Sequence, residues 1–154
     1  MSKTMETIAP QGPVPQITPD DYATILRGLQ LVRITLTSCQ AKSSLEGVSD
    51  VFAQPEKLPI HVRRNASFEA EDDVVTVRHE YSLASRYRGK TLLSIKAEYS
   101  LVFRTVEQFT ADFFEVFRRI ALPMYTWPYL RELVGSMTSR MDLPKLLLPL
   151  VHTQ

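Results

Sequence analysis

The side chains that could carry catalytic or metal chemistry are few and poorly grouped in this sequence. The acidic run 69–73 offers carboxylate oxygens, but it lacks the glycine-turned, twelve-residue spacing of a calcium loop. His79 lies between Arg78 and Glu80, and neighbouring residues of a strand point to opposite faces, so these groups cannot act on one substrate atom. We therefore interpret the acidic run as a solvated hairpin turn and His79 as a strand residue partly packed at an interface.

The single cysteine, Cys39, has no sequence neighbour of positive charge that would activate it as a nucleophile, and we expect a packed thiol. The sequence has no nucleophile elbow, no phosphate-binding glycine loop, no paired cysteines and no closely spaced histidine pair. These absences predict a protein without catalytic residues, metal sites or cofactors, which is therefore not an enzyme.

Composition narrows the function classes further. The 154 residues are 44% hydrophobic and 23% charged with a net charge of +1, which is typical of one globular domain and gives no reason to expect nucleic-acid binding. The basic cluster 86–90 is accordingly predicted to be a solvated turn. The uncharged stretch 120–130 is short and carries two prolines, so membrane insertion is not expected. A lone cysteine and an N-terminus without an apolar signal centre favour the cytoplasm.

The positions of the prolines and the period of the apolar residues predict the helices and strands that must position any site. Four of the ten prolines fall within the first nineteen residues, which predicts a flexible proline-rich arm over residues 1–18 and a single domain over 19–154. Thr18 and Pro19 are typical of a helix start, and Gly28 of its end.

Four segments alternate apolar and polar residues with the period of a half-buried strand: 29–41, 60–70, 75–83 and 91–104. The last three are joined by short acidic or glycine-containing connections, which favour antiparallel hairpins. In the first segment we expect Val32, Ile34 and Leu36 to share one face.

From residue 106 the apolar period lengthens to that of a helix, which Pro123 is expected to end. Residues 124–127 are then predicted to be an aromatic connector, and Pro128 to begin a second helix. Strands first and helices last give an α+β fold, with a four-stranded antiparallel sheet followed by two C-terminal helices packed on one face. The proline-interrupted apolar strip 143–151 must lie against the domain.

The predicted sheet has more apolar surface than two helices can cover. Leu92 and Val102 lie opposite the row that contains Leu93, so both faces of the central strands carry apolar side chains. An oligomer, or the capture of another polypeptide, is the physical expectation. The rings and thioether at 124–129 suit adaptive contacts with apolar chains, although they could equally cap the core.

Two C-terminal motifs carry a family resemblance. The stretch 127–140, WPYLRELVGSMTSR, followed by LPKLLLP at 143–149, resembles the C-terminal half of SecB, the bacterial export chaperone. The order of four antiparallel strands and two helices is similar as well. The resemblance covers about residues 29–151 and is specific over 127–149.

The resemblance implies a cytosolic, ATP-independent chaperone (a holdase) that binds unfolded polypeptides in hydrophobic grooves and assembles as a homotetramer, a dimer of dimers. By position it implies a polypeptide-binding groove of Leu93, Ile95, Tyr99, Leu101, Phe103, Tyr125, Trp127, Pro128 and Tyr129. It also implies an oligomer interface that contains Val32, Ile34, Leu36, Phe113 and Phe117.

Three functional alternatives remain open at this stage. The clients could be preproteins destined for export and translocation, or one aggregation-prone antitoxin of a toxin-antitoxin system, or the protein could be an oligomeric adaptor without chaperone activity. Export chaperones carry acids on the first strand that help to dock the motor SecA, whereas this chain has Ser38, Gln40 and Lys42 there. A SecA partner is therefore not expected.

Overall fold

A computed structural model describes residues 4–8, 14–44, 59–143, 146 and 148–149. Its centre is a sheet of five strands in the order β1-β3-β4-β5-β2. The strands are β1 (Thr4–Ile8), β2 (Leu29–Ser43), β3 (Ile60–Glu71), β4 (Val74–Tyr87) and β5 (Lys90–Thr105). The pairs β2–β5, β4–β5 and β3–β4 are antiparallel, so the four-stranded antiparallel sheet is confirmed.

The fifth strand comes from the segment predicted to be an arm. β1 pairs parallel with β3, with Thr4 opposite Ile60 and Ile8 opposite Arg64. The first proline of the chain is Pro10, so residues 4–8 keep every backbone donor that pairing requires.

Three helices accompany the sheet: α1 (Pro19–Arg27), α3 (Ala111–Ile120) and α4 (Leu122–Arg140). Thr18 caps α1 by accepting a hydrogen bond from the Asp21 amide at 3.1 Å, as predicted. The two C-terminal helices are confirmed, but their boundary differs from the expectation. Pro123 does not end a helix but lies in the first turn of α4, where a missing N–H costs nothing.

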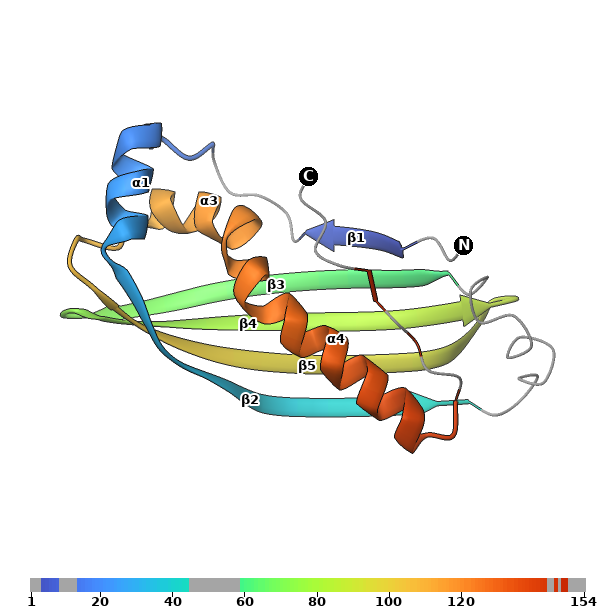
Figure 1. Cartoon of the computed structure of the whole chain (residues 1–154). Helices are drawn as coiled ribbons and strands as arrows, with labels where there is room; N and C mark the ends of the chain where they lie inside the picture. Colours follow the sequence, from blue (N-terminus) through green and yellow to red (C-terminus); the bar gives the residue numbers. More distant parts are fainter. Residues whose placement is uncertain (1–3, 9–13, 45–58, 144–145, 147, 150–154) are drawn as a thin grey trace.

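The aromatic connector expected at 124–127 is therefore helical, and Pro128 lies inside α4. Apolar contacts keep this proline-containing helix on the sheet, because Leu122, Leu130 and Val134 are fully buried beneath it. Figure 1 shows α4 crossing one face of the sheet obliquely, with α1 and α3 gathered at one end of the same face.

The core lies between this face and the helices. Every second residue of β4 and β5 is buried, including Val77, Leu83, Ile95 and Leu101. From α3, Phe113 stacks on Phe117 with ring centroids 5.4 Å apart. Of the three described leucines in the C-terminal strip, Leu146 and Leu148 are buried and Leu143 is partly buried, so the strip lies against the domain as its composition predicts.

The opposite face, here called the outer face, is polar. β4 directs Thr76, Arg78, Glu80 and Ser82 to it, and these side chains are exposed or half-buried. Leu92 and Val102 lie on this face as predicted, but Val74 and Ala84 are the only other apolar residues of β4 and β5 there, and Leu92 is itself buried. The expected excess of apolar surface on the second face of the central strands is therefore not found.

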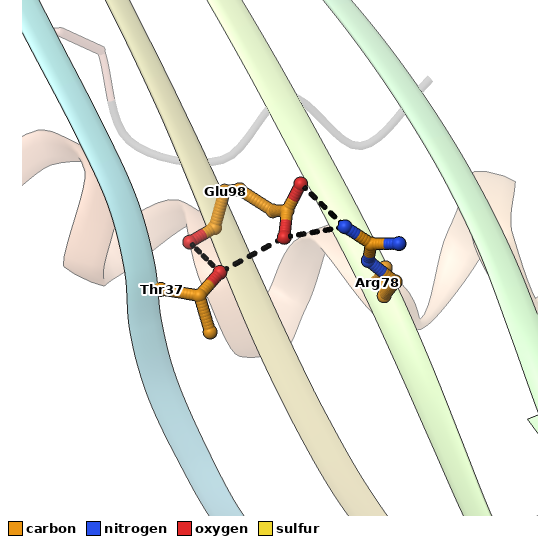
Figure 2. A network of polar contacts seen from close by, with 3 residues as sticks. All are labelled: Thr37, Arg78 and Glu98. Carbon is orange, nitrogen blue, oxygen red and sulfur yellow. Dashed lines mark hydrogen bonds and ion pairs between the residues drawn. The ribbon is translucent and has the colours of Figure 1, made fainter.

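A polar network on the outer face joins three strands (Figure 2). Arg78 Nη2 donates to both carboxylate oxygens of Glu98, at 3.0 and 3.1 Å, and Thr37 Oγ1 lies 3.0 Å from Glu98 Oε1. The hydrogen bond from Arg78, followed by that from Thr37, lowers the pKa of Glu98. Thr37 occupies a bulge between Leu36 and Ser38, so the network fixes β2 against β5 at this irregularity.

Candidate polypeptide-binding site

Helix α4 is fixed to the sheet by a buried cluster of hydroxyl and imidazole groups. Thr126 Oγ1 donates to the Leu122 carbonyl oxygen at 3.3 Å, and it lies 2.7 Å from the Tyr81 hydroxyl and 2.9 Å from His79 Nδ1. Because a threonine hydroxyl has one proton, it must accept from both Tyr81 and His79. This count places a proton on Nδ1 of His79.

Burial, and secondarily the positive charge of Arg64, lower the pKa of His79 to about 3. The imidazole is therefore neutral at physiological pH. His79 is 1% exposed, so it lies in the core of its own chain, and the expectation of a histidine partly packed at an interface is corrected. The cluster acts as an anchor for α4 rather than as a catalytic group.

One flank of α4 is covered by the C-terminal strip. Trp127 Nε1 donates to the Pro149 carbonyl oxygen, and Arg131 Nε donates to the Leu148 carbonyl oxygen, each at 2.8 Å. The Trp127 ring packs edge-on against Tyr81 with centroids 6.1 Å apart. Trp127 is only 3% exposed, so its ring supports this flank from within and offers no surface to a ligand.

No segment among the described residues covers the other flank of α4. Tyr125 packs edge-on against Phe103 with centroids 5.5 Å apart, and Tyr129 lies 6.4 Å from Tyr99. Tyr129 is nevertheless 52% exposed. The two tyrosines stand over β5 on the flank of α4 that lies toward the edge strand β2.

Strand β2 continues this apolar surface to the edge of the sheet. Leu31 pairs with Phe103 and Leu36 with Tyr99, the two residues beneath the tyrosines of α4. Leu31 and Leu36 are 36% and 43% exposed, and Ile34 between them is half-buried. We call this region the β2–α4 surface; it comprises Leu31, Ile34, Leu36, Tyr125 and Tyr129, with Tyr99 and Phe103 as its floor.

Two bulges in β2 create the surface. The register shifts between Leu31 and Arg33 and again between Leu36 and Ser38. Without the first shift, Leu31 and Ile34 would point to opposite faces, because side chains alternate along a regular strand. The expectation that Val32, Ile34 and Leu36 share a face therefore needs correction: Val32 lies at the first bulge and Leu31 takes its place.

The other predicted groove residues form the base of this region or lie outside it. Leu93, Ile95 and Leu101 are buried beneath α4 and the C-terminal strip, so they support the surface without being accessible. Pro128 is exposed beside a separate hollow of about 410 Å³. That hollow is lined by Pro128, Arg131, Glu132, Gly135, Ser136, Ser139 and Leu148.

The residues predicted for the oligomer interface separate into two groups. Val32 and Leu36 are exposed and Ile34 is half-buried on the edge strand. Phe113 and Phe117 are fully buried between α3 and its neighbours, so they offer no surface to a second copy in this conformation. The sequence predicts these two residues at an interface, but they lie in the core, because α3 directs its aromatic side chains into its own chain.

Cys39 also differs from the expectation. It pairs with Ala97 on the same face as Leu36, and it is exposed instead of packed. The nearby buried phenol of Tyr99 has its pKa raised to about 12, chiefly by burial.

Within the described ranges, no three metal-ligating side chains meet, and no helix has the length and apolarity needed to span a membrane.

Comparison with solved structures gives one informative similarity. The Rv1957 SecB-like chaperone of Mycobacterium tuberculosis, solved with a ChAD peptide from the Rv1956 HigA1 antitoxin, superposes with a TM-score of 0.69 at 18% identity. The alignment covers 86% of this chain and 96% of the chaperone chain.

A Streptococcus agalactiae protein of unknown function gives a TM-score of 0.39 at 14% identity, over 79% of this chain and 97% of that one. No family model and no curated protein sequence matches significantly. The C-terminal motif and the superposition agree on the architecture, and the chain has the fold of a SecB-like chaperone.

Proposed function

We propose that this protein is an ATP-independent, SecB-like chaperone that holds nonnative polypeptide segments on the β2–α4 surface. The observation that carries the proposal is that Leu31, Leu36 and Tyr129 are exposed and lie around the neighbouring residues Phe103 and Tyr99 on the helix-bearing side of the sheet. Monomeric proteins rarely leave such contiguous apolar side chains uncovered unless they bind something.

The expected free energy of client binding is compatible with reversible holding. Burial of ~300 Å² of apolar client surface gives a gross gain of ~7 kcal/mol, and the ordering of an unfolded chain removes much of it. Individual contacts are then weak, and affinity for a long client grows by contact at several sites. The tyrosine rings offer large apolar contact area together with a hydroxyl that can bond to the backbone of a client segment.

The proposal is tested with a slowly refolding substrate whose aggregation is followed by light scattering. We expect the protein to suppress aggregation at stoichiometric concentration, and Leu36→Ser combined with Tyr129→Ser to lose most of that effect. Val106→Ser is the matched control, because Val106 is an exposed apolar residue outside the β2–α4 surface. Unchanged aggregation with the wild-type protein would contradict the proposal.

A dedicated antitoxin client is favoured over general export substrates by two observations. The similar Rv1957 chaperone was solved with an antitoxin peptide, and the outer face of β2 presents Ser38, Gln40 and Lys42 where an acidic motor-docking site would be needed. We propose antitoxin protection as the role and no docking to SecA. Co-expression with the product of a neighbouring antitoxin gene tests this role, and an antitoxin equally soluble without the chaperone would refute it.

The assembly and the absence of catalysis are part of the same proposal. Among the described strands, none pairs with the free edge of β2, and an open edge is a common site of association. We propose a cytoplasmic homotetramer without enzymatic activity, and sedimentation at four times 17.6 kDa is expected.

An adaptor without chaperone activity is distinguished by fluorescence. Trp127 is too buried to report on a ligand directly, so Tyr129→Trp supplies a reporter on the β2–α4 surface. Its emission should shift when an unfolded polypeptide is added, and it would remain constant for an adaptor that only oligomerises.

A further inference from the structure

The outer face of the sheet is divided by charge into two ends. At one end, β3 presents His61 and Arg63, β5 presents Lys96 and β2 presents Lys42, all exposed. Arg86 of β4 lies beyond them, near the β4–β5 turn. We call this region the basic end; it comprises His61, Arg63, Lys42, Lys96 and Arg86.

The register shows that these residues occupy neighbouring positions on one face. Lys96 pairs with Gln40 on one side and Ser82 on the other, and Ser82 pairs with Arg63. Lys96 and Arg63 are thus two strands apart, about 10 Å between backbones. The intervening outward residues are uncharged and short or flexible: Gln40, Ser82, Ala84 and Ser94.

The charges of the basic end are not neutralised within the described part of the chain. None of its five residues is in an ion pair with another described residue, whereas Arg78 pairs with Glu98 and Arg104 with Asp73 at the other end of the same face. The β4–β5 turn adds further positive charge. Arg88 and Gly89 take positive φ angles of 50° and 75° in a two-residue hairpin turn, and Lys90 follows.

We propose that the basic end is a second binding surface, which takes an acidic segment of a partner polypeptide. It lies on the face opposite the β2–α4 surface, so the proposal does not depend on the client site. Carboxylates spaced two residues apart on an extended segment are about 7 Å apart, which is compatible with the spacing of cations on neighbouring strands.

An acidic polypeptide fits this surface better than a nucleic acid does. Beyond the row of Lys96 and Arg63, the outer face turns acidic, with Glu80, Glu69 and Glu71 exposed. A phosphate backbone that continued in that direction would meet these carboxylates, since nucleic acids carry charge along their whole length. A peptide can confine its negative charge to the length of the basic end.

The test uses the full-length protein and a fluorescein-labelled peptide of ten glutamates, with fluorescence anisotropy at low ionic strength. We expect binding that weakens as salt is raised, and about tenfold weaker binding in Arg63→Gln combined with Lys96→Gln. Arg33→Gln is the matched control, because Arg33 is exposed elsewhere on the outer face, and it should change the affinity less than about twofold.

Three results would overturn the proposal. The first is equal binding by the double variant and the wild type, with both shown to be folded by circular dichroism. The second is tighter, variant-sensitive binding of a ten-nucleotide single strand, which would identify the surface as a nucleic-acid site. The third is a change in the sedimentation of the double variant without peptide, which would identify it as an interface between copies. Loss of client holding with intact peptide binding would affect only the function proposed above.

Discussion

The two flanks of helix α4 carry similar aromatic side chains but differ in what covers them. On one flank, Trp127 and Arg131 donate hydrogen bonds to the carbonyl oxygens of Pro149 and Leu148, and the C-terminal strip covers the ring. On the other flank, Tyr129 lies toward the edge strand β2, is 52% exposed and has no covering segment among the described residues. Aromatic content alone therefore does not identify a binding surface, because a second segment can cover the rings.

The covered flank should therefore contribute to stability and the open flank to binding. Leu148→Ala removes a side chain that is 1% exposed and should lower the free energy of unfolding by about 3 kcal/mol. Leu36→Ala, on the open flank, should lower it by less than about 1 kcal/mol. Urea denaturation measures both values. Losses of equal size would show that the two flanks do not differ in their contribution to stability.

The anchor beneath the helix should have the next largest effect. Thr126→Val leaves the Tyr81 hydroxyl and His79 Nδ1 without the oxygen that accepts from them, and it should cost about 2 kcal/mol. Thr126→Ser, which keeps the hydroxyl, is the matched control and should recover most of this loss. A Val variant as stable as the Ser variant would show that the cluster does not anchor α4.

Acid should weaken the same anchor. Because the pKa of His79 is about 3 in the folded protein and about 6.5 in an unfolded chain, only the unfolded state takes up this proton as pH falls below 6.5. The free energy of unfolding should then fall by up to about 1.4 kcal/mol per pH unit between pH 6.5 and 5. Denaturation at pH 7, 6 and 5 measures the slope, and His79→Phe should reduce it; an unchanged slope would exclude His79 as its source.

The smallest change in stability is expected on the covered flank, at the hydrogen bond of Trp127. Trp127→Phe keeps most of the buried ring but removes the hydrogen bond to the Pro149 carbonyl oxygen, which should cost about 1 kcal/mol. Because the indole is covered, suppression of substrate aggregation should stay unchanged. Loss of this suppression in a folded Trp127→Phe variant would show that the covered flank also binds clients.

Much of the fold could be predicted because the strands bury one face. The alternation in β4 and β5 predicts which residues are buried, from Val75 to Phe103, since a shift of one residue would reverse every side chain. The prolines of α4 were harder to interpret. Pro123 has the same local signature whether it ends one helix or begins the next, and only packing against the sheet decides between them.

The candidate site was predicted less completely for a similar reason. Tyr99, Phe103, Tyr125 and Tyr129 are predicted as groove residues from the sequence, whereas Ile34 and Leu36 are predicted for the oligomer interface. Leu31 is not predicted for either, because a bulge changes the phase of alternation and has no distinct sequence signature here. Trp127 was misplaced because its burial depends on a strip more than fifteen residues away along the chain. The burial of a residue by a segment that is distant in the sequence cannot be deduced from local periodicity.

Client binding to the β2–α4 surface can be tested most directly through Cys39. Cys39 is the only cysteine of the chain, is exposed, and lies on the same face of β2 as Leu36. A photo-crosslinker attached to Cys39 should capture an unfolded polypeptide, and Leu36→Ser with Tyr129→Ser should reduce the yield strongly. If the yield from Cys39 is no higher than from Ser100→Cys on the outer face, in a Cys39→Ser background, the account is contradicted.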